Sequence, residues 1–102
     1  MTIEEIHQTV KDFGDAAARG TAAGFDGVEL HGAHGYMIPQ FISTYTNKRT
    51  DEYGGDLEAR LKFPLEVIRE ARARIGEDHI LGYRLSADEL VTGGMAIEDT
   101  KT

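Results

Sequence analysis

The chain has 102 residues, 40% of them hydrophobic, which is a size and composition typical of a small globular protein. Its formal net charge of −7 argues against a nucleic-acid partner, because phosphate backbones attract basic surfaces. No apolar run approaches the ~20 residues that span a bilayer, so no membrane partner is expected, and the absence of cysteine excludes thiolate chemistry from this chain.

A first helix is predicted over residues 2–23. Apolar side chains recur there at steps of three and four, which places them on one face of a helix. These side chains are Ile3, Ile6, Val10, Phe13 and Ala17. Thr2 and Glu5 have the spacing of a capping box, in which each side chain bonds a free main-chain N–H at the helix start. Gly24 is expected to end the helix in a left-handed conformation.

A short strand, GVELH, is predicted over residues 27–31. The period of two along a strand puts the apolar side chains on one face and Glu29 and His31 on the other. The connection after it, residues 32–56, is long, so it is expected to be functional or to contain short helices of its own. An apolar cluster within it predicts one short helical turn. The cluster consists of Met37, Ile38, Phe41 and Ile42.

A second helix is predicted over residues 57–75. Its apolar stripe consists of Leu57, Leu61, Leu65, Ile68 and Ile75. Pro64 falls inside this stripe and leaves two alternatives open. Either the helix is kinked at the proline, or a short helix ends near Lys62 and a new one begins at Pro64. Gly76 is expected to end the helix.

A second strand, ILGYRLS, is predicted over residues 80–86, with Arg84 and Ser86 on one face. Residues 87–95 are expected to form a loop that ends in two glycines. Residues 96–102 are predicted to begin a third helix. The order of elements is therefore helix, strand, loop, helix, strand, loop and partial helix.

This order predicts an α/β fold. Two strands joined by a helix are expected to be parallel, with a right-handed crossover. A parallel sheet of two strands cannot bury itself, and such sheets occur with both faces covered, in barrels and doubly wound folds. The chain is therefore expected to be a piece of a larger α/β fold or an assembly module.

Polar side chains stand at the carboxyl ends of both predicted strands, His31 on the first and Arg84 on the second. In α/β barrels the site lies at that end of the strands. His34 and Tyr36 follow His31 within a span of six residues, and all three side chains can donate hydrogen bonds or move protons. An isolated pair of histidines at this spacing is more often a core or surface feature than a metal pair, because zinc requires further ligands.

Several runs of residues occur together in one order and spacing: HGAHGY, QFIS, TNKRTDEYGG, LEAR, FPLEVI and YRLSADE. Together they strongly resemble the Old Yellow Enzyme family of FMN-dependent oxidoreductases, the NADH:flavin oxidoreductase / NADH oxidase type. The bacterial branch with the 2,4-dienoyl-CoA reductases and enoate reductases is the most similar. The family fold is a TIM barrel, so the resemblance implies a fragment of a (β/α)8 barrel. Residues 1–102 then form about its fourth and fifth β/α units, with no second domain.

The resemblance also implies a role for each of the four polar side chains near the strand ends, which we call the polar set. His31 and His34 match the pair that grips the substrate carbonyl oxygen, where donors stabilise the charge of the developing enolate. Tyr36 matches the proton donor to the α-carbon. Arg84 matches the arginine beside the flavin, where a fixed positive charge favours the anionic reduced form.

Structural alternatives stand beside these roles. In the alternative interpretation, Tyr36 is a loop aromatic that packs on Met37 or Ile38. Arg84 then forms an ion pair with Glu29, which points to the same side of the neighbouring strand. The run TNKRTDEYGG is interpreted mainly as loop architecture, with Arg49 paired to Asp51 and two glycines making a turn, and Arg60 is expected to be structural.

The intact family member is expected to use FMN as cofactor and NAD(P)H as reductant, and to reduce a small-molecule α,β-unsaturated carbonyl in the cytoplasm. The chain alone is expected to be inactive, because the phosphate-binding loops of such barrels follow the seventh and eighth strands. Its expected partners are the missing remainder of the barrel or another copy of itself. The alternative function is a catalytically silent barrel fragment that acts as a self-associating or complementing module.

Overall fold

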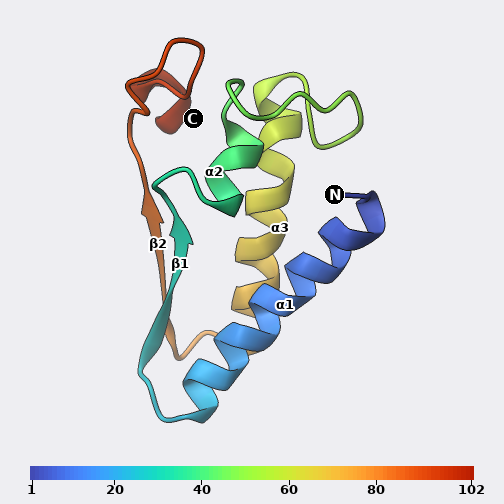
Figure 1. Ribbon diagram of the computed structural model, residues 1–102. Helices are drawn as coiled ribbons and strands as arrows, with labels where there is room; N and C mark the ends of the chain where they lie inside the picture. The colour runs from blue at the N-terminus through green and yellow to red at the C-terminus, as the bar shows by residue number, and fades with distance from the viewer. The chain divides into compact units, whose positions relative to one another are not determined.

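The computed structural model describes all residues from 1 to 102, and its elements follow the predicted order (Figure 1). They are α1 (Ile3–Ala22), β1 (Gly27–Gly32), α2 (Met37–Ile42), α3 (Leu57–Ile75), β2 (Ile80–Leu85) and α4 (Ile97–Thr100). The two strands pair in one sheet and run in the same direction. None of these helices combines the length and the apolar composition of a membrane span.

The chain divides into two compact units. Unit 1 consists of Met1–Leu30 and Leu65–Tyr83, and unit 2 consists of His31–Pro64 and Arg84–Thr102. Helix α3 and both strands contribute residues to both units. All four residues of the predicted polar set belong to unit 2.

Helix α1 begins and ends as the sequence predicts. The Thr2 N–H donates to Glu5 Oε2 at 2.7 Å, and the Glu5 N–H donates to Thr2 Oγ1 at 3.1 Å, which completes the capping box. At the other end Gly24 has a φ of 94°, and the N–H groups of Gly24 and Phe25 donate to the carbonyls of Thr21 and Gly20. This pair of bonds is a Schellman motif, which a left-handed glycine makes possible.

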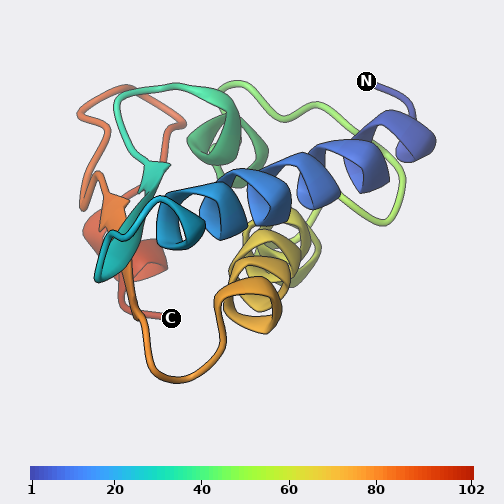
Figure 2. The ribbon, with the colours of Figure 1, turned by 90° about the horizontal axis from the view of Figure 1, so that it is seen from below.

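Within unit 1, α1 packs closely against the carboxyl-terminal half of α3, and Figure 2 shows the two helices crossing. Gly14 is buried at this crossing, where an added Cβ would lie 2.6 Å from Cγ of Glu70. An ion pair between Arg74 and Asp15 links the same two helices. The absence of a side chain at Gly14 therefore permits the close approach.

The register of the two strands is set in unit 1. The Ile80 N–H donates to the Asp26 carbonyl at 3.0 Å, and a Cβ on Gly82 would lie 3.7 Å from Cβ of Glu29. Gly82 therefore faces the same side of the strand pair as Glu29. Leu30, which points to the opposite side, is buried with 5% of its surface exposed.

The core of unit 2 forms around the aromatic ring of Phe41 on α2. This ring lies 4.3 Å from the ring of Phe63 on α3 and 6.4 Å from that of Tyr53, measured between centroids. Tyr53 and Phe63 are completely buried, and Ile38 on α2 is too. The predicted helical turn at residues 37–42 is confirmed, and its buried side chains Ile38, Phe41 and Ile42 belong to this core.

Helix α3 is continuous through Pro64, which excludes the alternative of a short helix that ends near Lys62 and a new one that begins at Pro64. Proline has no N–H to donate to the carbonyl four residues earlier, and this costs stability inside a helix. Pro64 is buried, however, so packing of its ring offsets part of that cost. The helix ends at Gly76, which has a φ of 76° and donates its N–H to the Arg72 carbonyl at 3.0 Å.

Candidate functional site

The structure brings the rings of His31, His34 and Tyr36 together in unit 2. The centroid of the His31 ring lies 5.1 Å from that of His34 and 5.6 Å from that of Tyr36. All three side chains are exposed, Tyr36 to 65% of its surface. Hydrogen-bond donors that converge and remain accessible form a surface on which a polar atom of a ligand can bind.

A tight turn makes this convergence possible. His31 lies on β1, and the chain turns after Ala33 through His34 and Gly35, which have φ values of 61° and 72°. The Tyr36 N–H points back to the Ala33 carbonyl at 3.5 Å. Positive φ at both central residues is the mark of a type I′ turn, for which glycine and asparagine are the usual residues. A histidine tolerates this conformation better than most side chains but still carries strain.

Two side chains from other elements hold this turn. The Ser86 hydroxyl, just after β2, accepts a hydrogen bond from the His34 N–H at 3.1 Å. The Gln40 side chain on α2 donates from Nε2 to the Gly35 carbonyl at 2.7 Å. Sequence reasoning assigned no role to either residue. Their place inside the runs QFIS and YRLSADE was the signal that could have pointed to them.

Arg84 lies on β2 near the strand's carboxyl end and is exposed. Side chains alternate along a strand, so Arg84 faces the same side as Gly82, and His31 faces the same side as Glu29. Because Gly82 and Glu29 share a face, Arg84 and His31 share that face too. The guanidinium and the imidazoles are therefore presented at one end of the strand pair, and their catalytic roles remain predictions.

The polar loop between α2 and α3 is built by its own side chains. Arg49 donates to Asp51 through Nε at 3.0 Å and through Nη2 at 2.6 Å, which confirms the predicted pair. This bidentate bond holds the pKa of the Asp51 carboxyl below its usual value and raises the pKa of Arg49. The buried Arg60 donates to the carbonyls of Ile42 and Gly55, so its role is structural as expected.

The arrangement of side chains does not support a metal centre. No group of three or more His, Cys, Asp or Glu residues is placed to hold a metal ion. Catalytic zinc sites have three protein ligands. The pair formed by His31 and His34 therefore offers too few ligands for a catalytic zinc site.

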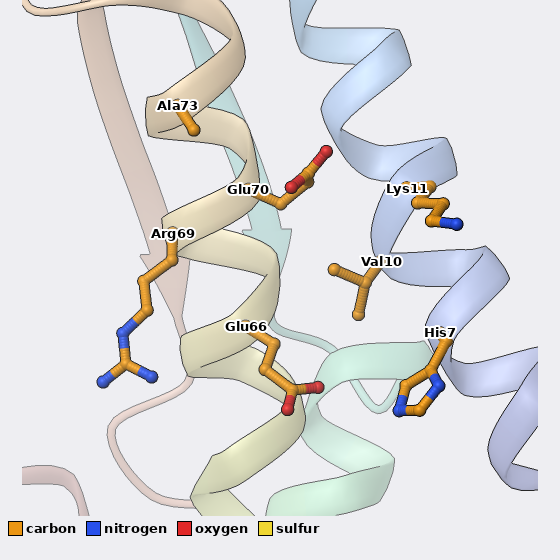
Figure 3. A pocket seen from close by; sticks show the side chains of 7 residues that line it. All are labelled: His7, Val10, Lys11, Glu66, Arg69, Glu70 and Ala73. Carbon is orange, nitrogen blue, oxygen red and sulfur yellow. The ribbon is translucent and has the colours of Figure 1, made fainter.

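A groove of about 430 Å³ lies in unit 1 between α1 and α3 (Figure 3). Val10 and Ala73 give it an apolar floor, and Figure 3 shows Lys11 and Arg69 pointing away from each other on opposite helices. These two cations thus do not converge on one point. The groove contains none of the predicted site residues, so we do not assign the chemistry to it.

The fold and this polar set define a class of protein: an α/β-barrel segment with hydrogen-bond donors and a cation at the carboxyl ends of parallel strands. Comparison with known proteins gives the family. The model of the NADH:flavin oxidoreductase / NADH oxidase family matches residues 1–102. The chain belongs to this family, which confirms the resemblance to the Old Yellow Enzymes.

Individual relatives agree with this assignment. The chain is 52% identical over 101 residues to NADH oxidase of Thermoanaerobacter brockii, and spans 99% of itself and 16% of that protein. It is 53% identical over 95 residues to 12-oxophytodienoate reductase 2 of Arabidopsis thaliana, and spans 91% of itself and 25% of the relative. The chain therefore spans about a quarter or less of these two curated relatives.

A solved structure supports the fold. The 2-naphthoyl-CoA reductase, in complex with 2-naphthoyl-CoA, superposes on 97% of the chain with a TM-score of 0.95 and 39% sequence identity, and the match spans 15% of that protein. The predicted fold class, an α/β fragment of a TIM barrel with parallel strands, is confirmed.

Proposed function

We propose that the chain forms the central part of an FMN-dependent oxidoreductase that uses NAD(P)H to reduce an α,β-unsaturated carbonyl. The observation that carries the proposal is the convergence of the three exposed rings, with His31 5.1 Å from His34 and 5.6 Å from Tyr36. FMN, reduced by NAD(P)H, supplies the hydride that the β-carbon of the substrate receives. The names of the relatives, an NADH oxidase and two reductases, describe chemistry of this kind.

The residues of the chain fit this chemistry. The imidazoles of His31 and His34 donate hydrogen bonds to the substrate's carbonyl oxygen, on which negative charge develops as the β-carbon is reduced. Tyr36 then donates the phenolic proton to the α-carbon. Arg84 contributes an exposed cation on the same face, suited to the electron-rich edge of a reduced flavin. Each group acts from a rigid element or from a turn fixed to one.

A chimera tests this proposal. We suggest replacing the matching 101 residues of the Thermoanaerobacter brockii NADH oxidase with this chain and measuring NADH-dependent reduction of cyclohexenone. The unmodified chimera is expected to be active. Tyr36→Phe is expected to lower the rate of substrate reduction by 10²–10⁴-fold, the usual contribution of a general acid, while reduction of the flavin by NADH stays unchanged.

The histidines and the arginine give further readouts. His31→Ala and His34→Ala are expected to weaken the binding of carbonyl compounds, because each variant removes a donor to the oxygen. Arg84→Ala is expected to lower the flavin's reduction potential, a measurement that needs no substrate. Tyr45→Phe, which alters an exposed loop tyrosine outside the ring cluster, is the matched control. A chimera in which all these variants behave like the unmodified one contradicts the proposal.

We further propose that the isolated chain neither binds FMN nor reduces enones. The polar set provides donors for a carbonyl and a cation for a flavin ring, but phosphate groups in such barrels bind to loops that follow the seventh and eighth strands. The purified chain is expected to be colourless. Flavin absorbance in a stoichiometric amount, or reduction of cyclohexenone by the chain with added FMN and NADH, contradicts this expectation.

A second candidate function is a silent module that associates with another copy or with a complementary barrel piece. The strand β2 favours it, because two of its apolar side chains are exposed, Ile80 to 70% and Leu85 to 48% of their surfaces. Strands of a two-stranded sheet each have one edge with unpaired main-chain groups, which can pair with another chain. Light scattering after size exclusion distinguishes a folded oligomer, which supports this function, from a monomer.

A further inference from the structure

We propose that Ser86 and Gln40 are positioning residues, which hold the turn at His34 and Gly35 so that the three rings converge. The inference deepens the proposed function and rests on it, because the placement of the rings matters to catalysis only if they bind and protonate the substrate. Neither side chain carries a ring or a charge of its own. Both act through the main chain of the turn.

The turn needs support from outside. His34 has a φ of 61°, in the left-handed region that side chains with a Cβ occupy at a cost. Residues in such conformations persist only when the surroundings fix them. The bond that closes the turn is weak, because the Tyr36 N–H lies 3.5 Å from the Ala33 carbonyl oxygen. The turn's own hydrogen bond is therefore insufficient to fix the conformation of His34.

The two side-chain bonds supply this support. The His34 N–H lies 3.1 Å from Ser86 Oγ, and the Gly35 carbonyl lies 2.7 Å from Nε2 of Gln40. Both distances are within the normal range for strong hydrogen bonds, unlike the bond that closes the turn. The bonded N–H belongs to the first of the two residues of positive φ, and the bonded carbonyl belongs to the second. The pair of bonds thus fixes both ends of the strained segment.

The two supporting side chains come from different elements of the chain. Ser86 lies 52 residues after His34, two residues beyond Arg84, so its bond ties the turn to the strand that carries the cation. Gln40 belongs to α2, whose apolar side is buried in the core of unit 2. Loss of either bond frees one end of the turn. The expected result is that His34 and Tyr36 move away from His31 while the core keeps its structure.

The test is nuclear magnetic resonance on the full 102-residue chain. It measures hydrogen exchange of the His34 amide and the nuclear Overhauser contacts between the rings of His31 and Tyr36. In Ser86→Ala the His34 amide is expected to exchange about fivefold faster, as the loss of one hydrogen bond predicts. The ring contacts are expected to weaken. Ser86→Thr, which keeps the hydroxyl, is expected to restore both.

Gln40→Glu gives a pH-dependent readout that a change in packing alone would not produce. The variant has nearly the same shape, but its ionised carboxylate has no proton to donate to the Gly35 carbonyl. The ring contacts are expected to weaken at pH 7 relative to the wild type. Below the ordinary glutamate pKa of about 4.3 the carboxyl regains a donor, so the contacts are expected to recover. Ser86→Ala is expected to show no such recovery at low pH.

Thr44→Val is the matched control, because it removes a loop hydroxyl that bonds the Gly93 carbonyl and has no contact with the turn. Ring contacts that stay unchanged in both Ser86→Ala and Gln40→Glu overturn the inference, and so does an equal loss in Thr44→Val. The measurement uses no flavin and no substrate. An inactive chimera therefore contradicts the proposed function alone, whereas unchanged ring contacts in the chain contradict the positioning roles alone.

Discussion

Asn47 donates a hydrogen bond from its side-chain amide to the main-chain carbonyl of Tyr53 at 2.8 Å. The same amide nitrogen donates to the carbonyl of Phe41 at 2.6 Å, and the amide oxygen accepts from the Arg49 N–H at 3.0 Å. One half-buried side chain thus connects α2 to two positions of the polar loop, Arg49 and Tyr53. The loop between α2 and α3 owes its shape to this residue more than to any regular secondary structure.

Asn47→Asp is therefore expected to destabilise the chain by about 3 kcal/mol, because two carbonyls lose their donor and face a carboxylate instead. Urea unfolding of the purified chain measures the change. Thr50→Ala, at an exposed position of the same loop, is the control and is expected to change stability by less than about 0.5 kcal/mol. A stability of Asn47→Asp equal to that of the wild type shows that the loop is held by other contacts.

The two glycines at the end of this loop are expected to resist substitution for different reasons. A Cβ on Gly54 would lie 2.3 Å from the Arg49 carbonyl oxygen, whereas a Cβ on Gly55 would meet nothing within 4 Å. Gly55 instead has a φ of 100°, which side chains rarely adopt. Gly54→Ala fails through a collision with main chain, and Gly55→Ala fails through backbone strain.

D-alanine separates these causes, because it accepts positive φ as readily as L-alanine accepts negative φ. In chemically synthesised chains, D-alanine at position 55 is expected to be tolerated, and L-alanine there to cost about 1–2 kcal/mol. L-alanine at position 54 is expected to cost about 1–3 kcal/mol. Thermal unfolding checks the series. An equal loss from the two enantiomers at position 55 contradicts the strain argument.

The ion pair of Arg49 and Asp51 predicts how stability depends on pH. The hydrogen bonds from Arg49 lower the pKa of the Asp51 carboxyl in the folded chain. A lowered folded pKa means that the contribution is fully present above the unfolded value, about 3.9. It is lost as the pH falls through the lower folded value, because the unfolded chain takes up the proton first.

Asp51→Asn is therefore expected to flatten the decrease of stability between about pH 5 and pH 2 relative to the wild type. Urea midpoints measured at half-unit steps of pH show the difference. Thr50→Ala is again the control, and it is expected to keep the wild-type slope. If stability falls as steeply with decreasing pH in Asp51→Asn as in the wild type, Asp51 contributes nothing to this decrease.

The sequence predicted those features that depend on local spacing. The capping box of Thr2 and Glu5, the left-handed Gly24 and the pair of Arg49 and Asp51 involve residues no more than three apart, and all are confirmed. The helical turn at residues 37–42 followed from its apolar cluster. Each of these patterns has a fixed spacing in the sequence, so it can be recognised without coordinates.

The features that the sequence left open depend on distant contacts. Helix α3 continues through Pro64, whose ring is buried, and no spacing in the sequence encodes that burial. The left-handed conformation of His34 and its bond to Ser86 connect residues 52 positions apart. The roles predicted for His31, His34 and Tyr36 followed from the family resemblance, whereas the hydrogen bonds to the turn became visible only in the fold.

The strain at His34 leads to a last prediction, in which stability and activity are affected differently. Asparagine adopts the left-handed conformation readily and keeps an N–H donor, whereas valine is β-branched and resists positive φ. His34→Asn is expected to leave the chain as stable as the wild type or more stable, by up to about 1 kcal/mol. His34→Val is expected to cost about 1–3 kcal/mol. Urea unfolding of the two variants measures these values.

In the chimera, His34→Asn is expected to keep most of the rate of cyclohexenone reduction, because a donor to the carbonyl oxygen remains. His34→Val is expected to lose it, along with the affinity for the carbonyl compound. His31→Asn is the comparison, since His31 lies on the extended β1 and carries no such strain. The stability of His31→Asn is therefore expected not to increase. A destabilising His34→Asn means that the imidazole is itself part of what holds the turn, and that the left-handed backbone there is not a source of strain.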